Sequence, residues 1–166
     1  MQEPIFTGSC VAIVTPMNPD GSINYSEYGK LIDFQIENGT DAILACGTTG
    51  ESACMDHQEH CKVIEYTLEK VNGRVPVIAG TGSNDTAYAV ELTKEAKNMG
   101  ADAVLSVTPY YNKTSQAGLV AHFTKIADSV DIPMIVYNVP SRTGCNIKPA
   151  TYAELAKHPN IVATKE

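Results

Sequence analysis

The sequence has few basic residues: 12 lysines and arginines stand against 19 aspartates and glutamates, which gives a net charge of -7. A surface with this charge repels phosphate groups, so nucleic acid and anionic membrane surfaces are excluded as partners. No apolar run approaches the ~20 residues that a membrane-spanning helix needs. The residues that follow Met1 form neither a basic nor an apolar stretch, so we expect no secretory signal. These absences favour a cytoplasmic protein.

Motifs that would indicate a particular chemistry are also missing. The five cysteines form no C-x-x-C pair, and we expect Cys10, Cys46 and Cys61, which stand among apolar residues, to be buried reduced thiols. His57 and His60 lie three residues apart but lack a third metal ligand, so we expect both at the surface. Neither common glycine-rich phosphate motif occurs. We therefore expect no metal site.

The sequence does contain a regular series of short apolar segments. With 166 residues, of which 43% are hydrophobic, the chain can form one folded domain. Six almost continuously apolar runs are typical of strands that are buried on both faces of a parallel sheet. The predicted strands are Val11–Thr15, Ala42–Cys46, Val75–Ala79, Ala103–Val107, Met134–Tyr137 and Ile161–Thr164.

Helical patterns separate the predicted strands. Apolar residues recur at helical spacing between Cys61 and Val71 and between Ala89 and Met99. Alternating strands and helices predict an α/β fold with a parallel sheet. Two architectures stay open at this point: an open doubly wound sheet, and the first six strands of a (β/α)8 barrel, which when complete takes ~250 residues. Three further predicted helices are Tyr25–Asn38, Leu119–Val130 and Pro149–Lys157.

Polar residues and glycines gather directly after the predicted strands. Both parallel architectures build their functional sites at the carboxyl ends of the strands. We therefore expect the site at this edge of the sheet. The segments concerned are Gly47–Ser52, Gly80–Asn84, Thr108–Asn112, Tyr137–Gly144 and Lys165–Glu166.

Each of these segments is ambiguous by itself, but together they indicate amine catalysis. Thr48 and Thr49 could bind a small carboxylate or cap a tight turn. By themselves, Tyr137 is typical of a tyrosine packed at a strand end, and Arg142 of an arginine in a solvated loop. Lys165, at the end of an apolar strand, is a candidate nucleophile, because a neutral lysine in a dry site attacks a ketone carbonyl. A tyrosine can then move the protons, and an arginine fork can hold a second carboxylate.

Six blocks of the sequence carry a family resemblance, in this order: Val11–Pro16, Gly47–Ser52, Pro76–Gly82, Thr108–Asn112, Tyr137–Gly144 and Lys165–Glu166. With these blocks the chain resembles the dihydrodipicolinate synthase branch of the pyruvate-dependent class I aldolase family, which also contains N-acetylneuraminate lyase. The resemblance implies a (β/α)8 TIM barrel that assembles as a homotetramer, a dimer of tight dimers. In the family, two further βα units and a helical C-terminal region follow the reactive lysine. We therefore expect residues 1–166 to be the N-terminal part of a single barrel domain.

The resemblance implies catalytic roles for four residues. Lys165 matches the lysine that forms a Schiff base with pyruvate. Thr48, Tyr111 and Tyr137 match the family's proton-relay residues, and the position of Tyr111 typically enters the site of a neighbouring subunit. The implied lyase needs no metal or organic cofactor, because the Schiff base itself activates the substrate.

Two further residues match substrate-binding positions. Thr49 matches the residue that binds the pyruvate carboxylate, and Arg142 matches the arginine that binds the carboxylate of L-aspartate 4-semialdehyde. The implied reaction condenses these two substrates to 4-hydroxy-tetrahydrodipicolinate, in the biosynthesis of diaminopimelate and lysine. Within the same family, a pyruvate aldolase with another aldehyde substrate is the alternative. A non-catalytic chain that acts as an association module through Tyr110 and Tyr111 is a third interpretation.

An allosteric lysine site is also implied by the resemblance. Where the family has a glutamate that holds the amino group of the effector, this sequence has Tyr88, which cannot supply that negative charge. Feedback inhibition by lysine is therefore left open. The matching positions are Ser52, Ala53, His57, His60, Asn84, Tyr88 and Tyr110.

Overall fold

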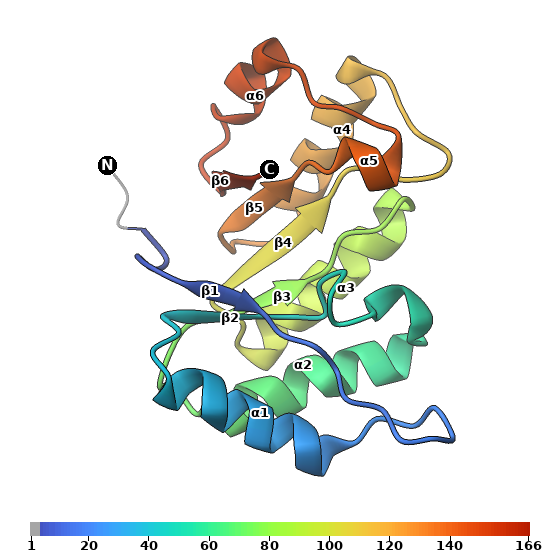
Figure 1. The fold of residues 1–166 in the computed structure, drawn as a ribbon. Coiled ribbons are helices and arrows are strands. Elements are labelled where there is room, and N and C mark those ends of the chain that lie inside the picture. The colour runs from blue at the N-terminus through green and yellow to red at the C-terminus, as the bar shows by residue number, and fades with distance from the viewer. Residues whose placement is uncertain (1–3) are drawn as a thin grey trace. The chain divides into compact units, whose positions relative to one another are not determined.

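The structure, a computed structural model, describes residues 4–166 and divides into two compact units (Figure 1). The first unit extends to Gly80 and includes Met99–Asp102, and the second comprises Thr81–Asn98 and Ala103–Glu166. Each unit contains three parallel strands. Within residues 4–166, no helix is both long enough and apolar enough to cross a membrane.

In the first unit, three strands pair in chain order. Strand β2 pairs in parallel with β1 on one side and with β3 on the other, and every residue of β2 and β3 is buried. Strands buried on both faces explain the continuous apolar runs in the sequence. The elements of this unit are β1 (Cys10–Ala12), α1 (Tyr25–Glu37), β2 (Ala42–Ala45), the short 3-10 helix η1 (Ser52–Cys54), α2 (His57–Val71) and β3 (Val77–Gly80).

Helices α1 and α2 lie side by side (Figure 1). The side chain of Asn24 accepts a hydrogen bond from the Glu27 N–H at the start of α1, and Asp56 caps α2 in the same way. Between the helices, the buried hydroxyls of Tyr28 and Thr67 are hydrogen-bonded at 2.8 Å. Because this bond satisfies both hydroxyls, the helices can pack closely without an unpaired polar group.

The second unit repeats the alternation of strands and helices. Strand β5 pairs in parallel with β4 and with β6, and α4 packs against α6 (Figure 1). Strands β4 and β5 are buried except for Val107, which is half-buried. The elements are α3 (Thr86–Met99), β4 (Ala103–Val107), α4 (Gln116–Ala127), β5 (Met134–Tyr137), α5 (Pro140–Thr143), α6 (Pro149–Leu155) and β6 (Ile161–Lys165).

The predicted strands and helices are present, although β3 begins at Val77 rather than Val75 and α4 spans Gln116–Ala127 rather than Leu119–Val130. Three further differences concern β1, β6 and two short helices. First, β1 ends at Ala12 rather than Thr15, because the chain leaves the ladder there and runs toward Gly50. Second, β6 is not buried: its three central residues are exposed, because among the described residues it pairs only with β5. Third, the short helices η1 and α5 carry no apolar repeat, so the periodicity did not reveal them.

Candidate active site

In the second unit, Tyr137 and Lys165 end two neighbouring strands and lie side by side. Their Cα atoms are partners in the parallel register of β5 and β6. The Nζ atom of Lys165 lies 4.2 Å from the centre of the Tyr137 ring. Tyr137 is only 9% exposed, whereas Lys165 is half-buried. The amine is therefore reachable from outside while its aromatic neighbour is held rigidly in the sheet.

The segment that follows β5 carries Arg142. Pro140 starts the short helix α5, and Gly144 ends it with a φ of 66°, a left-handed conformation that favours glycine. Arg142 is exposed, and its backbone N–H donates to the Val139 carbonyl. An exposed guanidinium on a short, capped turn is well placed to bind a carboxylate from solution.

Tyr110 and Tyr111 follow β4. The Thr108 N–H donates to the Tyr137 carbonyl at 3.0 Å, so this segment leaves the sheet beside the end of β5. Tyr111 is 90% exposed and has a φ of 67°, and Tyr110 is half-buried. In this left-handed backbone conformation, the Tyr111 side chain buries little of its surface within the second unit.

In the first unit, Thr48 and Thr49 lie exposed in a tight turn after β2. The Gly50 N–H closes the turn on the Gly47 carbonyl, and the buried hydroxyl of Thr15 donates to the Gly50 carbonyl at 2.8 Å. Two exposed hydroxyls, on a turn that the bond from Thr15 holds in place, can donate hydrogen bonds to a small carboxylate.

Within the second unit, the structure brings Lys165 and Tyr137 into contact. Thr48 and Thr49 lie in the first unit. Asn138 and Glu166 lie in segments that the sequence predicted to form the site, but the sequence assigned neither residue a role. The structure shows that they are hydrogen-bonded to each other beside the candidate site. Asn138 directly follows β5, and a polar residue in that position was the only signal available.

A family model described as the dihydrodipicolinate synthetase family matches residues 5–166. The chain belongs to this family. It is 61% identical over 166 residues to a 4-hydroxy-tetrahydrodipicolinate synthase of Acetivibrio thermocellus, covering 100% of this chain and 56% of the relative.

Two solved structures of the family resemble the chain closely. The dihydrodipicolinate synthase of Aquifex aeolicus has a TM-score of 0.94 and 53% identity, with 97% of this chain and 55% of that chain covered. The chloride-inhibited enzyme of Acinetobacter baumannii, complexed with pyruvate, has a TM-score of 0.94 and 51% identity, with 95% and 54% covered. The chain spans about half the length of the curated relatives it matches. The predicted fold class, the first six strands of a (β/α)8 TIM barrel, is confirmed.

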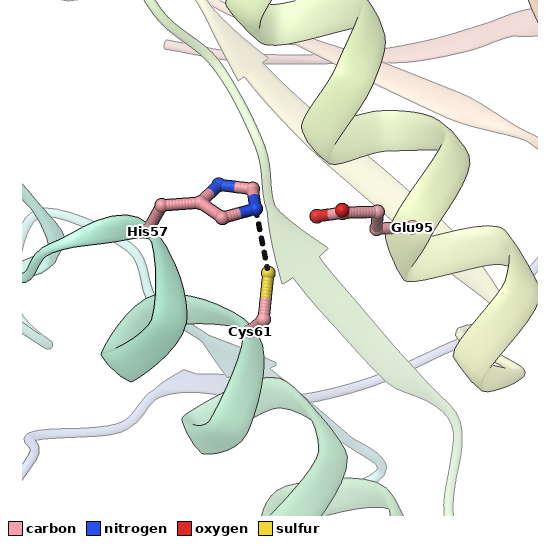
Figure 2. Close-up of side chains that lie close together, drawn as sticks. All are labelled: His57, Cys61 and Glu95. Carbon is pink, nitrogen blue, oxygen red and sulfur yellow. Dashed lines mark hydrogen bonds between the residues drawn. The ribbon is translucent and has the colours of Figure 1, made fainter.

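The residues that match the family's lysine-binding positions belong to both units. In the first unit, His57 is half-buried, and its Nε2 lies 3.9 Å from the Sγ of Cys61, one turn along α2 (Figure 2). The prediction that His60 lies at the surface is wrong, because its ring is buried and its Nε2 lies 2.8 Å from the Gly80 carbonyl oxygen. Burial lowers the pKa of His60 and favours its neutral form. Ser52 and Ala53 belong to the first unit, whereas Asn84, Tyr88 and Tyr110 belong to the second.

Two of the three cysteines predicted to be buried are more accessible than expected. Cys46 is buried, whereas Cys10 and Cys61 are half-buried. Cys10 lies in β1, whose three residues are all half-buried, and Cys61 lies on α2 close to the half-buried His57. Apolar residues next to a cysteine in the sequence therefore did not predict how deeply that cysteine is buried.

A second buried histidine lies on α4 in the second unit. The Nδ1 of His122 is 2.8 Å from the hydroxyl oxygen of Thr86, while Nε2 has no hydrogen-bond partner in the described residues. Burial lowers the pKa of His122 from its ordinary value of 6.5 to about 4. Between pH 6.5 and about pH 4 the folded protein therefore keeps this ring neutral, whereas the unfolded chain protonates it.

We expect His122 to make the protein acid-labile. Its contribution to the free energy of unfolding is full above pH 6.5 and is lost as the pH falls toward 4, because the unfolded state binds the proton more tightly. This shift corresponds to roughly 3 kcal/mol at most. The variant His122→Asn keeps an amide near Thr86 and does not titrate, so urea midpoints measured from pH 7 to pH 4 should fall less steeply than in the wild type. Equal slopes would contradict the assignment.

Proposed function

We propose that this chain carries the Schiff-base centre of a 4-hydroxy-tetrahydrodipicolinate synthase, a lyase that condenses pyruvate with L-aspartate 4-semialdehyde. The observation that carries the proposal is the contact between the Lys165 amine and the Tyr137 ring at the ends of β5 and β6. The pyruvate complex of the Acinetobacter baumannii enzyme supports pyruvate as the first substrate. We further propose that residues 1–166 belong to one barrel domain.

The proposed chemistry begins at the Lys165 amine. The amine adds to the ketone carbon of pyruvate, and the resulting carbinolamine loses water to form an iminium ion. The positive nitrogen withdraws electrons, so a proton can leave the methyl group and an enamine forms. The enamine carbon then bonds to the aldehyde carbon of the second substrate, and the aldehyde oxygen takes up a proton to become a hydroxyl. Because the iminium is the electron sink, the reaction as proposed requires neither a metal nor an organic cofactor.

The other predicted site residues have supporting roles in this proposal. Tyr137, with Thr48 and Tyr111, would relay protons to and from the carbinolamine oxygen. Thr49 would hold the pyruvate carboxylate through its hydroxyl and through backbone N–H groups of the turn. Arg142 would hold the carboxylate of the aldehyde substrate, and its exposed position on α5 leaves the guanidinium accessible.

The first test is to trap the Schiff base. The purified protein is incubated with pyruvate and borohydride, and its intact mass is measured before peptide mapping. We expect one reduced pyruvyl adduct per chain, located at Lys165. A protein that stays unmodified, under conditions in which its fold is intact by circular dichroism, would overturn the proposed Schiff-base chemistry.

Arg142→Ala is expected to impair use of the aldehyde selectively. The apparent KM for aspartate semialdehyde should rise about 10-fold or more, because a charge-assisted fork to a carboxylate is lost. Trapping of pyruvate should not change. Arg142→Lys is the matched control, since it keeps the charge but loses the fork and should have an intermediate KM. If KM and kcat for the semialdehyde stayed at wild-type values, another aldehyde would be the substrate.

We also propose that the protein is a homo-oligomer in the cytoplasm. The observation that supports a partner is Tyr111, which is 90% exposed on a left-handed turn and matches a position that enters a neighbouring subunit's site in the family.

Lysine binding to the predicted allosteric positions remains a proposal as well. There Tyr88 offers a hydroxyl rather than a carboxylate, so any lysine site would lack the ion pair to the amino group.

A further inference from the structure

Asn138 lies at the centre of a hydrogen-bond network in the second unit. Its side chain is 3% exposed, although it directly follows the last residue of β5. Its Oδ1 accepts a hydrogen bond from the Ile147 N–H at 3.2 Å, and its Nδ2 donates to the Oδ1 of Asn146 at 2.9 Å. The same Nδ2 donates to a carboxylate oxygen of Glu166 at 3.1 Å. One buried amide therefore uses its acceptor and both of its donor hydrogens.

These bonds connect three of the segments that carry proposed site residues, those of Tyr137, Arg142 and Lys165. Tyr137 precedes Asn138, and Lys165 precedes Glu166 in the chain. The backbone N–H of Asn138 also donates to the Lys165 carbonyl at 2.9 Å. The bonds to Asn146 and Ile147 close the chain segment between Asn138 and Ile147, which contains Arg142, into a loop joined at its base.

Two neighbouring groups hold the outer ends of the network. The hydroxyl of Tyr152 donates to the Glu166 carboxylate, and burial, followed by this carboxylate, raises the pKa of Tyr152. The Nε2 of Gln116 donates to the Asn146 carbonyl at 2.8 Å, and its Oε1 accepts from the Lys148 N–H at 3.0 Å. Two partners of Asn138, Asn146 and Glu166, are thus themselves bonded to residues of α4 and α6.

We propose that Asn138 is a positioning residue that holds the Arg142 segment at a defined place relative to Tyr137 and Lys165. This inference rests on the proposed function, and it adds a determinant of aldehyde recognition that does not itself touch the substrate. Only asparagine satisfies all three partners here, because aspartate lacks the N–H donors and would face the Glu166 carboxylate. Loss of the amide frees the base of the loop and leaves the Lys165 amine in place.

The test combines hydrogen exchange with kinetics in the purified protein. In Asn138→Ala, the Ile147 amide and the peptide covering residues 139–147 should exchange about 10-fold faster, because the bond at the base of the loop is gone. The apparent KM for aspartate semialdehyde should rise about 10-fold, with the rate of pyruvate trapping unchanged. The matched control is Asn98→Ala, which alters an exposed asparagine on α3 and should leave both readouts at wild-type values.

A double-mutant cycle with Arg142→Ala separates positioning from general destabilisation. If Asn138 acts through Arg142, the two KM effects are not additive, and adding Asn138→Ala to Arg142→Ala changes KM less than twofold. The inference would be overturned if the KM increase in the double variant equalled the product of the two single-variant increases, or if the exchange rate for residues 139–147 were unchanged. Should Asn138→Ala fail to fold, Asn146→Ala is measured in its place. It removes the acceptor of Asn138 Nδ2 at an exposed position but keeps the Ile147 N–H bond to Asn138, so the peptide covering residues 139–147 should exchange faster while the Ile147 amide does not. An unchanged exchange rate for that peptide would contradict the inference.

The exchange measurement keeps this inference distinct from the proposed function. If wild-type protein forms no pyruvyl adduct, the Schiff-base proposal fails. If wild-type protein forms the adduct but Asn138→Ala leaves loop exchange and the semialdehyde KM unchanged, the role of Asn138 fails and the Schiff-base proposal stands.

Discussion

Replacing Lys165 by alanine is expected to abolish the reduced pyruvyl adduct and to lower kcat by a factor of about 10^4 or more, because it removes the amine that forms the covalent intermediate. The effect should be this large because the amine is a reactant and not a stabilising contact. The structure makes the prediction specific to one lysine, since the Lys165 Nζ lies over the Tyr137 ring. The measurement is intact mass after treatment with pyruvate and borohydride, together with steady-state rates.

Two control variants show whether loss of the adduct reports the amine itself. Lys165→Arg keeps a positive charge near the Tyr137 ring but cannot form the Schiff base, because the guanidinium remains protonated. It should therefore be as inactive as the alanine variant. Lys157→Ala removes an exposed lysine that is paired with Glu154 on the surface, and it should keep the full adduct. An adduct of normal yield in Lys165→Ala would assign the nucleophile to another lysine.

Replacing Gly80 by alanine is expected to destabilise the first unit and to weaken pyruvate binding together. A Cβ atom at Gly80 would collide with the Cys46 carbonyl oxygen and would lie 2.7 Å from the Cys46 carbonyl carbon. These are backbone atoms of a residue that already has a φ of 54°, so they cannot move aside as a flexible side chain would. Relieving the clash should cost about 3 kcal/mol of unfolding free energy.

The clash at Gly80 also affects the proposed carboxylate site. Cys46 directly precedes the turn that carries Thr48 and Thr49, so a shift of its backbone displaces both hydroxyls. We expect the urea midpoint to fall and the apparent KM for pyruvate to rise. Gly47→Ala is the matched control in the same turn, because its Cβ would meet only the Leu44 side chain, at 3.3 Å. Equal urea midpoints for Gly80→Ala and the wild type would show that β3 tolerates the added carbon.

The buried strands and the reactive strand ends could be predicted from local patterns. Short apolar runs bounded by glycine and proline predicted strands that pair in parallel, and β2 and β5 follow the predicted ranges to within one residue. Asp85 directly precedes α3, and its carboxylate accepts a hydrogen bond from the Ala87 N–H at 2.9 Å, as expected of an aspartate before a helix. Such features depend on residues a few positions apart, which is why composition and spacing reveal them.

The contact between Tyr137 and Lys165 could be predicted only in part from the sequence. The sequence predicted that both residues end strands, but it could not determine the register that makes their Cα atoms partners. A register shift occurs between Met134 and Ile135 in the pairing with β6, and apolar patterning contains no signal for such an irregularity. The pairing that places the amine over the ring is therefore a result of the tertiary structure.

By itself, the sequence determined the order of strands and helices, the placement of Lys165 and Tyr137 at strand ends, and that of Arg142 in the segment after β5, because these depend on short-range periodicity and on turn residues. Only the tertiary structure decided that His60 is buried against Gly80, and that the Asn138 amide joins two segments beside β5. Those bonds span 20 residues for His60 and 28 residues for Asn138 and Glu166. Contacts at such separations are set by how the folded chain packs, because packing brings together polar groups whose partners no local pattern identifies.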